Sequence, residues 1–391
     1  MLAYTDCALT AAQGLAANRV ENRMQTTTFK QKVNFRRLGW KPRTARGLGI
    51  DIGQTVTKIV FFERRRNSLL SFCSAAIPTR VRAVDAENPQ ISWSTRDLKD
   101  VSQAVRHLLS SRSEAKHCRT AVTISMSACD YRTVYVPQNT QVNMRAIQET
   151  IAQAKNDHRK RCIALLPSPT GDANDSQAKL RCFSLPEDLS WSVAQALDEA
   201  GLTPQALDGL PWCLESALRM VAEPHKPDSI DLALDWSFGN PTLVAIKAGQ
   251  INYVRSMLHG SVQKLTSAVC GDYQMDAAEA GHWIGQCLEQ TALEVADAAQ
   301  IETYDAVSRI CSQLADEIHT ALEYLAWRNQ GCKVGTLWLT GGATRIAGLS
   351  DLLKSKLNCQ VADWQFDVAD ACLTSEYAQA AALAWREVQY E

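Results

Sequence analysis

The sequence predicts an α/β fold of two lobes that arose by duplication of one unit, and three observations indicate it. A strand that ends in aspartate, a short turn and two more strands occur twice, over residues 47–77 and 230–255. Segments with helical apolar spacing alternate with the other strands. The length of 391 residues, with 46% hydrophobic residues, suits two to three compact units at roughly 150 residues each.

The first unit combines strands and helices. Residues 55–62 are rich in β-branched and aromatic residues, which favours a strand, and a polar turn follows at 64–68. Residues 96–111 carry apolar side chains on one helical face. The strands predicted in this unit are 47–53, 55–62, 69–77 and a pair within 120–136 that ends at Pro137. The predicted helices are 96–111 and 143–156.

The second unit begins at Ile230 and follows the same order. A helix over 310–325 has one apolar stripe. The last strand of this unit runs into Gly341 and Gly342, and a helix with leucines between positions 349 and 357 begins after them. The strands predicted in this unit are 231–235, 242–246, 251–255 and 334–340.

Composition shifts place the domain boundaries. Residues 1–46 hold nine lysines and arginines against two acidic residues and show no apolar periodicity, so we expect a flexible basic arm there. A basic patch that touches anionic lipid at the inner membrane face is the alternative. We expect the first lobe over 47–226 and the second lobe over 227–391.

Overall composition excludes several classes of protein. A net charge of −1 argues against a dedicated nucleic-acid binder. No apolar run approaches the roughly 18 residues that cross a bilayer, and the N-terminus lacks the order of a secretory signal. Thirteen cysteines, without a Cys-x-x-Cys pair, fit neither a disulfide framework nor a zinc site. We therefore expect a cytosolic, soluble protein.

The turn after the first strand can hold phosphate. Gly53 follows the strand directly, and such a glycine lets successive backbone N–H groups point outward around an anion. Asp51 could position a magnesium ion through water, and Lys58 could supply countercharge. An ordinary hairpin whose aspartate accepts turn hydrogen bonds is the alternative. A dinucleotide fingerprint is excluded, because it needs a helix where residues 55–62 are strand-like.

The diglycine junction at Gly341 and Gly342 is the third element of interest. Paired glycines allow a ligand to approach the backbone, and the N-terminus of the following helix favours negative charge. A plain strand-to-helix turn is the alternative. The sequence contains no Walker loop, no Gly-x-Ser-x-Gly elbow and no His-Glu-x-x-His motif.

Two hairpins with an aspartate, followed by a diglycine junction, resemble the layout of the actin-like ATPase superfamily, whose two lobes are duplicated ribonuclease H-like units. Within it the chain most resembles the PilM family of type IV pilus assembly, which is itself similar to FtsA. The resemblance covers roughly residues 47–386 and implies an inserted α+β subdomain near 118–200 of the first lobe. The segments that carry it are 49–58, 121–137, 249–255, 339–349, 377–378 and 381–384.

The resemblance implies a site for ATP and Mg²⁺. Asp51 and Asp235 would orient magnesium-bound water. The residues implied to contact phosphates are Gly53, Gln54, Thr55 and Lys58. The residues implied to approach the adenosine are Gly341, Gly342 and Ala343.

Four positions depart from the family's pattern. The second phosphate turn usually reads Asp-x-Gly, but Ser237 stands at the third position and Gly239 follows two positions later. Pro241 removes an N–H donor. His282 stands where the family has a lysine that contacts adenosine. Since these changes weaken the site, we expect nucleotide binding rather than efficient hydrolysis.

The resemblance further implies a cytoplasmic assembly protein, peripheral to the inner membrane. Its partners would be other pilus components and the short N-terminal tail of a PilN-like membrane protein. The tail would lie in a groove between the first core subdomain and the inserted one, near residues 118–200. Nucleotide would bias the lobes between open and closed states. One alternative is a small-metabolite kinase of the same superfamily, with Asp208 or Glu215 as the candidate base. The other is a degenerate scaffold that binds no nucleotide.

Overall fold

The described residues of the computed structural model are 44–65, 68–78, 98–110, 118–137, 143–155, 158–167, 177–222, 228–273, 275–292, 297–329, 331–368 and 371–390. The basic arm expected over 1–46 lies outside them, except for residues 44–46, which begin the first strand. The rest of that expectation stays a prediction.

The first sheet has five strands in the order β3-β2-β1-β4-β8. β1 and β2 form the predicted antiparallel hairpin, and its register places Lys58 opposite Asp51. β4 runs parallel to β1, and β8 runs parallel to β4. The strands of this sheet are β1 (Thr44–Ile52), β2 (Val56–Arg65), β3 (Ser68–Pro78), β4 (Arg119–Ile124) and β8 (Ala206–Asp208).

The second sheet repeats the first. Its order is β11-β10-β9-β12-β13, with β9, β10 and β11 antiparallel and β12 and β13 parallel to β9. The predicted internal duplication is therefore confirmed, and each sheet with its helices is called a lobe below. The strands are β9 (Ser229–Asp235), β10 (Thr242–Lys247), β11 (Gln250–Ser256), β12 (Lys333–Thr340) and β13 (Val361–Asp363).

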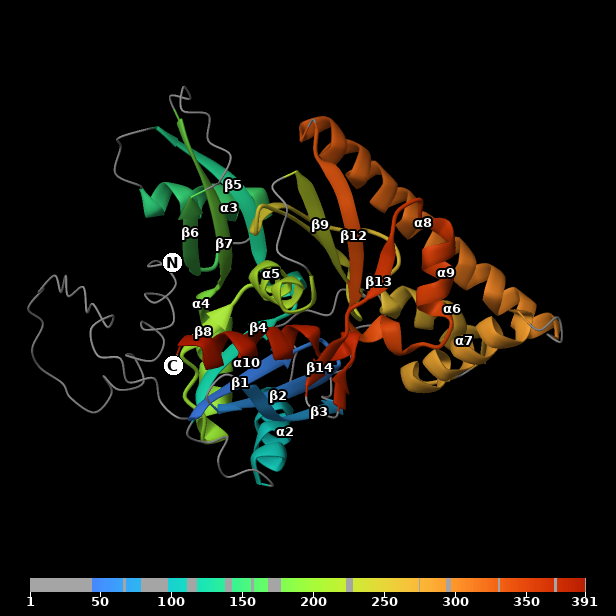
Figure 1. Ribbon diagram of the computed structural model, residues 1–391, viewed down its shortest axis with the longest axis horizontal. Coiled ribbons are helices and arrows are strands. Elements are labelled where there is room, and N and C mark those ends of the chain that lie inside the picture. The colour runs from blue at the N-terminus through green and yellow to red at the C-terminus, as the bar shows by residue number, and fades with distance from the viewer. Residues whose placement is uncertain are drawn as a thin grey trace, which may run out of the picture.

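Helix α5 (Leu210–Val221) lies between the two sheets, at the centre of Figure 1. Its residues Leu214 and Leu218 belong to one hydrophobic cluster with Ile50 of β1 and Val244 of β10. This shared cluster joins the lobes, because burying apolar side chains from both sheets against one helix stabilises their contact.

The last helix, α10 (Ala378–Tyr390), packs on β1 of the first sheet, although the sequence assigns residues 227–391 to the second lobe. Glycines in β1 permit this approach. A Cβ on Gly49 would lie 1.9 Å from the carbonyl oxygen of Ala380, and one on Gly47 would lie 2.3 Å from that of Ala384. The alanine-rich face of α10 therefore contacts a strand without side chains at two positions.

Helices cover the outer face of the second sheet, on the right of Figure 1. The helix predicted over 310–325 begins twelve residues earlier, at Ala298, because Asp297 and Gln300 form a capping box there. A 3₁₀ turn, Gly342–Arg345, begins at the second glycine of the pair and precedes the following helix. The helices are α6 (Val262–Tyr273), α7 (Ala277–Ala292), α8 (Ala298–Arg328) and α9 (Leu349–Lys356).

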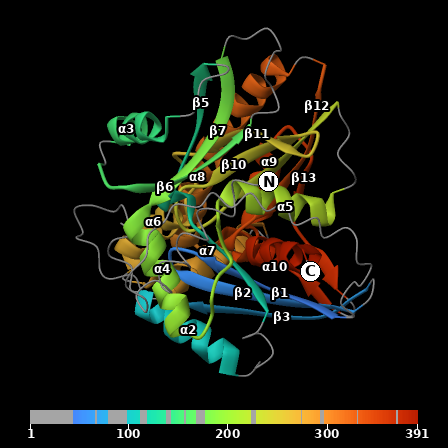
Figure 2. The ribbon, with the colours of Figure 1, turned by 90° about the vertical axis from the view of Figure 1, so that its left-hand side faces the viewer.

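A third sheet, in the order β5-β7-β6, forms an α+β subdomain with helix α3, at the top of Figure 2. Here one expectation was wrong. Both strands predicted within 120–136 form, but β4 joins the first sheet while β5 pairs with β7, because a 3₁₀ turn at Met126–Ala128 separates them. The elements are β5 (Asp130–Pro137), α3 (Met144–Lys155), β6 (Arg161–Pro167) and β7 (Gln177–Pro186).

The remaining elements complete the fold. Helices α2 (Leu98–Ser110) and α4 (Glu187–Glu199) contact each other, and α2 matches the helix predicted over 96–111. Short strands β14 (Phe366–Val368) and β15 (Ala371–Leu373) form a ribbon before α10. In the part of the chain that the structure describes, no helix combines the length and apolarity needed to span a bilayer. Most of the described cysteines are buried thiols.

Candidate functional site

The carboxylates near the ends of β1 and β9 lie within electrostatic range of each other. Asp51 and Asp235 are both buried, with 7% and 5% of their surface exposed. The negative charge of Asp51 contributes to raising the pKa of Asp235, so the two groups interact electrostatically. They are equivalent positions of the duplicated unit, and the fold brings together the two aspartates that the sequence singles out.

Asp51 is paired with the lysine opposite it in the hairpin. The Lys58 ammonium lies 3.2 Å from a carboxylate oxygen of Asp51, and both side chains are buried. Antiparallel pairing of β1 and β2 places the two residues side by side. The pair leaves a cation and an anion together at the end of the first hairpin.

Asp235 is held by two donors. The Ser237 hydroxyl donates to its carboxylate at 2.5 Å, and the Gln379 amide donates at 2.7 Å. Burial is the main cause that raises the pKa of Asp235, with a smaller rise from the charge of Asp51, and the net value is about 6. The two hydrogen bonds and the charge of Lys58 oppose that rise. The hydroxyl of Ser237 therefore stabilises the Asp235 carboxylate by a hydrogen bond, at a position where the pattern of the resembling family has glycine.

The first turn is tighter than an open phosphate loop. The Gly53 N–H donates to the carbonyl of Val56 at 3.0 Å, and a Cβ on Gly53 would lie 2.8 Å from that oxygen. This N–H is therefore used within the turn, although the sequence predicts that it points outward. Thr55 follows in the same turn and is half-buried.

The two turns touch through Gln54 and Gly239. The Gln54 amide donates to the Ser127 hydroxyl at 2.8 Å, and its Oε1 lies 2.6 Å from where a Cβ of Gly239 would stand. Gly239, displaced by two positions from the family's pattern, thus provides the room that the Gln54 side chain occupies. A side chain from the first turn consequently fills space between the two lobes.

The diglycine lies against the second turn. Gly341 adopts a φ of +94°, and a Cβ there would lie 2.7 Å from the Trp236 carbonyl and 2.8 Å from Asp235 Oδ1. Ala343 is buried and donates its N–H to the same Trp236 carbonyl at 2.9 Å. A Cβ on Gly342 would meet nothing within 4 Å. The structure thus brings the diglycine and Asp235 together.

His282 lies on helix α7 of the second lobe. Its exposed ring is hydrogen-bonded to Gln286 at 3.1 Å. On the same helix a Cβ on Gly285 would lie 3.4 Å from Ala347, just after the 3₁₀ turn that begins at Gly342. α7 therefore passes beside the residues that follow the segment expected to approach the adenosine.

The donor set fits a magnesium nucleotide held mainly through water. Two buried carboxylates that repel each other are relieved by a divalent cation between them. Among the described residues no group of three His, Cys, Asp or Glu side chains could hold a metal directly. Magnesium keeps several waters when one or two carboxylates bind it, which agrees with such a set.

Two contributors to the site were not foreseen from the sequence. Gln379 comes from α10, and Ser127 comes from the 3₁₀ turn after β4. Ser127 lies in the segment 121–137 that carries the resemblance, and Gln379 directly follows Tyr377 and Ala378. Neither was singled out, because each side chain reaches the site only where a distant element packs against it.

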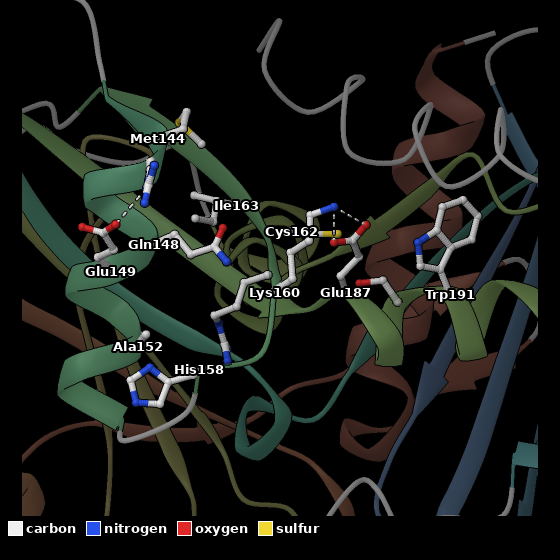
Figure 3. Close-up of a pocket in the computed structure, with 13 residues that line it drawn as sticks. Met144, Gln148, Glu149, Ala152, His158, Lys160, Cys162, Ile163, Glu187 and Trp191 are labelled. Atoms are coloured by element: carbon white, nitrogen blue, oxygen red, sulfur yellow. Dashed lines mark hydrogen bonds and ion pairs between the residues drawn. The ribbon is translucent and has the colours of Figure 1, made fainter.

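A separate groove lies in the inserted subdomain (Figure 3). Residues of α3, β6 and α4 enclose about 630 Å³, and we name it the α3–α4 groove. Its apolar lining includes Met144, Ile163 and Trp191. Ion pairs between Lys160 and Glu187 (2.9 Å) and between Arg145 and Glu149 (3.0 Å) flank it. Such a volume lies within the range of small-molecule and cofactor pockets.

No family model matches the chain, and no curated protein matches it. Among solved structures it is similar to one described as "PilM-PilN type IV pilus biogenesis complex", with a TM-score of 0.63 and 21% identity over 89% of this chain and 99% of that chain. It is also similar to the ethanolamine utilization protein EutJ from Carboxydothermus hydrogenoformans, with a TM-score of 0.46 and 13% identity over 96% and 98% of the two chains. The first likeness shows that this chain has the two-lobed actin-like fold.

Proposed function

We propose that the chain is an actin-like assembly protein of a type IV pilus or a related secretion machine. It binds ATP with Mg²⁺ between its lobes and holds the short cytosolic tail of a PilN-like inner-membrane protein. The observation that carries the nucleotide part is the juxtaposition of Asp51 and Asp235, each at the end of an equivalent strand. The likeness to the PilM–PilN structure supports the assembly part.

Each part of the nucleotide would meet a different element of the site. Asp51 and Asp235 would orient magnesium-bound water, and magnesium would offset the charge of the phosphates. The residues proposed to contact phosphates are Gly53, Gln54, Thr55, Lys58, Ser237 and Gly239. Those proposed for the adenosine side are Gly341, Gly342, Ala343 and His282. Because Gln54 fills space beside Gly239, its side chain would move when phosphates enter.

The α3–α4 groove is the proposed site for the tail. It lies within residues 118–200, where the resemblance places the partner's groove. Its apolar floor suits aliphatic side chains of an extended peptide, and the ion pairs at its rim can re-pair with polar groups of the tail. Holding such a tail would keep the protein at the cytoplasmic face of the inner membrane, beside the other pilus components.

A titration with fluorescent mant-ATP and Mg²⁺ tests the nucleotide site. Wild type should bind, and Asp51→Ala should lose binding while it stays folded by circular dichroism. Asp198→Ala, which removes an exposed carboxylate from α4, is the matched control and should bind as wild type does. If the wild type does not bind mant-ATP, the nucleotide part of the proposal is wrong and the chain is a scaffold that binds no nucleotide.

Fluorescence anisotropy tests the groove. The probes are labelled peptides with the N-terminal tails of single-pass membrane proteins encoded beside this chain's gene. Met144→Glu changes a 45%-exposed apolar residue at the start of α3, and Ile301→Glu changes a 47%-exposed one near the start of α8. Only Met144→Glu should weaken binding. Equal binding by both variants would contradict the groove assignment.

Both candidate bases of the kinase alternative, Asp208 and Glu215, are engaged in ion pairs. Asp208 is fully buried and forms an ion pair with Arg386, and its Oδ1 accepts from the Gly209 N–H at 2.9 Å. Glu215 forms an ion pair with Arg219 at 2.5 Å. Since a catalytic base must accept a proton from a substrate in the cleft, these pairings argue against either residue in that role.

A further inference from the structure

A second cavity lies where the inserted subdomain meets the second lobe. It measures about 120 Å³ and is lined from one side by β5 and β7 and from the other by β11 and the end of α8. We name it the inter-lobe cavity. Its cationic lining consists of Lys179, Arg181 and Arg328, whereas Arg132, which also lines it, is ion-paired with Asp130 at 2.6 Å. It is separate from the α3–α4 groove, with which it shares no lining residue.

Strand pairing explains why the cations gather there. In the β5–β7 pair Thr133 stands opposite Arg181, and Tyr135 stands opposite Lys179. Residues directly opposite in an antiparallel pair share one face of the sheet. The other face, with Val134 and Cys182, packs on α3. The cationic face is therefore turned towards the second lobe.

The second lobe completes the cavity. Arg181 donates to the carbonyl of Ile251 in β11 at 2.9 Å, which ties the two walls together. Arg328 enters from the last turn of α8, where it is hydrogen-bonded to the Tyr324 hydroxyl at 3.2 Å. Among the lining residues none is acidic. The cavity consequently presents positive charge from both lobes to whatever enters it.

The inter-lobe cavity has room for only one small anionic group. At about 120 Å³ the cavity is smaller than the roughly 300–1,000 Å³ of small-molecule and cofactor pockets, so it suits one small group such as a carboxylate. A nucleotide is too large for it. Guanidinium groups bind carboxylates through two parallel hydrogen bonds, and two arginines here come from different lobes.

Exposed aromatic side chains extend outward from the cavity. The ring of Tyr253, which lines it, lies 5.5 Å from that of Tyr324, and Tyr324 lies 6.2 Å from Trp327. Trp327 is 71% exposed, and Tyr135 on the opposite wall is 60% exposed. A free anion would leave these rings in water, whereas a peptide can cover them with apolar side chains.

We propose that the inter-lobe cavity receives a carboxylate from an acidic segment of a protein partner, whose neighbouring apolar residues lie on Tyr324 and Trp327. Charge complementarity and the aromatic row together favour this occupant. Since both lobes supply cations, the bound segment also holds the lobes together. The site is independent of the nucleotide and of the tail proposed for the α3–α4 groove.

Binding of a short fluorescein-labelled peptide of alternating glutamate and leucine tests the proposal, with a lysine–leucine peptide as its counterpart. The full chain should bind the acidic peptide and not the basic one, with an affinity that falls as salt increases. Lys179→Glu and Arg328→Glu should each weaken binding about tenfold, as expected for reversal of a contacting charge. Trp327→Ser should weaken it at unchanged salt dependence.

Matched controls separate this result from general charge effects. Arg309→Glu reverses an exposed arginine of the same helix away from the cavity and should bind as wild type does. Equal binding of both peptides, or wild-type binding by Arg328→Glu, would overturn the proposal. Displacement of the peptide by inorganic phosphate, but not by chloride at equal ionic strength, would assign a small-anion site instead. Self-association lost in Arg328→Glu, measured by sedimentation, would assign a second copy of the chain.

Discussion

The side-chain amide of Gln379 donates a hydrogen bond of 2.7 Å to the carboxylate of Asp235. Gln379 lies in α10, which packs on the first sheet, whereas Asp235 ends β9 of the second sheet. Gln379 is only 1% exposed, so this bond is buried. The bond therefore joins the last helix, which packs on the first sheet, to a carboxylate of the second lobe.

Replacing Gln379 with leucine should destabilise the protein. A hydrogen bond to a charged group contributes about 1.5–3 kcal/mol, and Gln379 is one of two side chains that donate to this buried carboxylate. The loss in the free energy of unfolding, measured by urea denaturation, should be larger at pH 8 than at pH 5. Gln389→Leu, at an exposed position of the same helix, should leave stability nearly unchanged. An equal loss in both variants would point to helix packing instead.

The raised pKa of Asp235 predicts how stability depends on pH. Its pKa is about 6 in the folded protein and 3.8 in the reference state, so the folded state holds the proton more tightly. The contribution of this group is therefore most favourable below pH 4 and is lost as pH rises through 6. At pH 8 ionisation costs on the order of 3 kcal/mol relative to a neutral side chain.

Asp235→Asn keeps the hydrogen-bond acceptor and removes the titration. The difference in melting temperature between Asp235→Asn and wild type should be largest near pH 8 and shrink towards pH 5. Taking the difference between the two proteins cancels the titration of every other carboxylate. A difference that does not vary with pH would show that Asp235 has an ordinary pKa.

The two adjacent glycines should respond differently to alanine. Gly341 has a positive φ, and a Cβ there meets the Trp236 carbonyl at 2.7 Å, so Gly341→Ala should cost about 2 kcal/mol or more. Gly342 has open space around it, so Gly342→Ala should change stability by less than about 1 kcal/mol. Urea denaturation of both variants measures this, and similar losses would refute the close approach of Gly341 to the second turn.

Removing one partner of the ion pair between Asp208 and Arg386 should lower the stability of the folded protein. Arg386→Met leaves the fully buried Asp208 carboxylate without its cation, which should destabilise by about 3–5 kcal/mol. The double variant Asp208→Asn/Arg386→Met removes the stranded charge and should recover much of that loss. If the double variant is as unstable as the single one, packing of the arginine stem decides the effect.

Local patterns in the sequence predicted the hairpins well. Strands β1, β2, β9 and β10 lie close to their expected bounds, because alternation and turn residues act over a few positions. The strand pair within 120–136 was wrong in its pairing, since both strands have suitable residues and only the sheets they join decide their partners. The early start of α8 depended on a capping box that apolar periodicity alone does not reveal.

The sequence by itself determined that two equivalent hairpins exist, that each carries an aspartate near its strand end, and that a diglycine follows the last long strand. These features depend on neighbours along the chain. Only the tertiary structure decided that Gln54 reaches Gly239, that Gln379 reaches Asp235 and that cations from both lobes meet in one cavity. Such contacts join residues far apart in the chain, and their distances depend on how the sheets pack around α5 and α10, which no local pattern encodes.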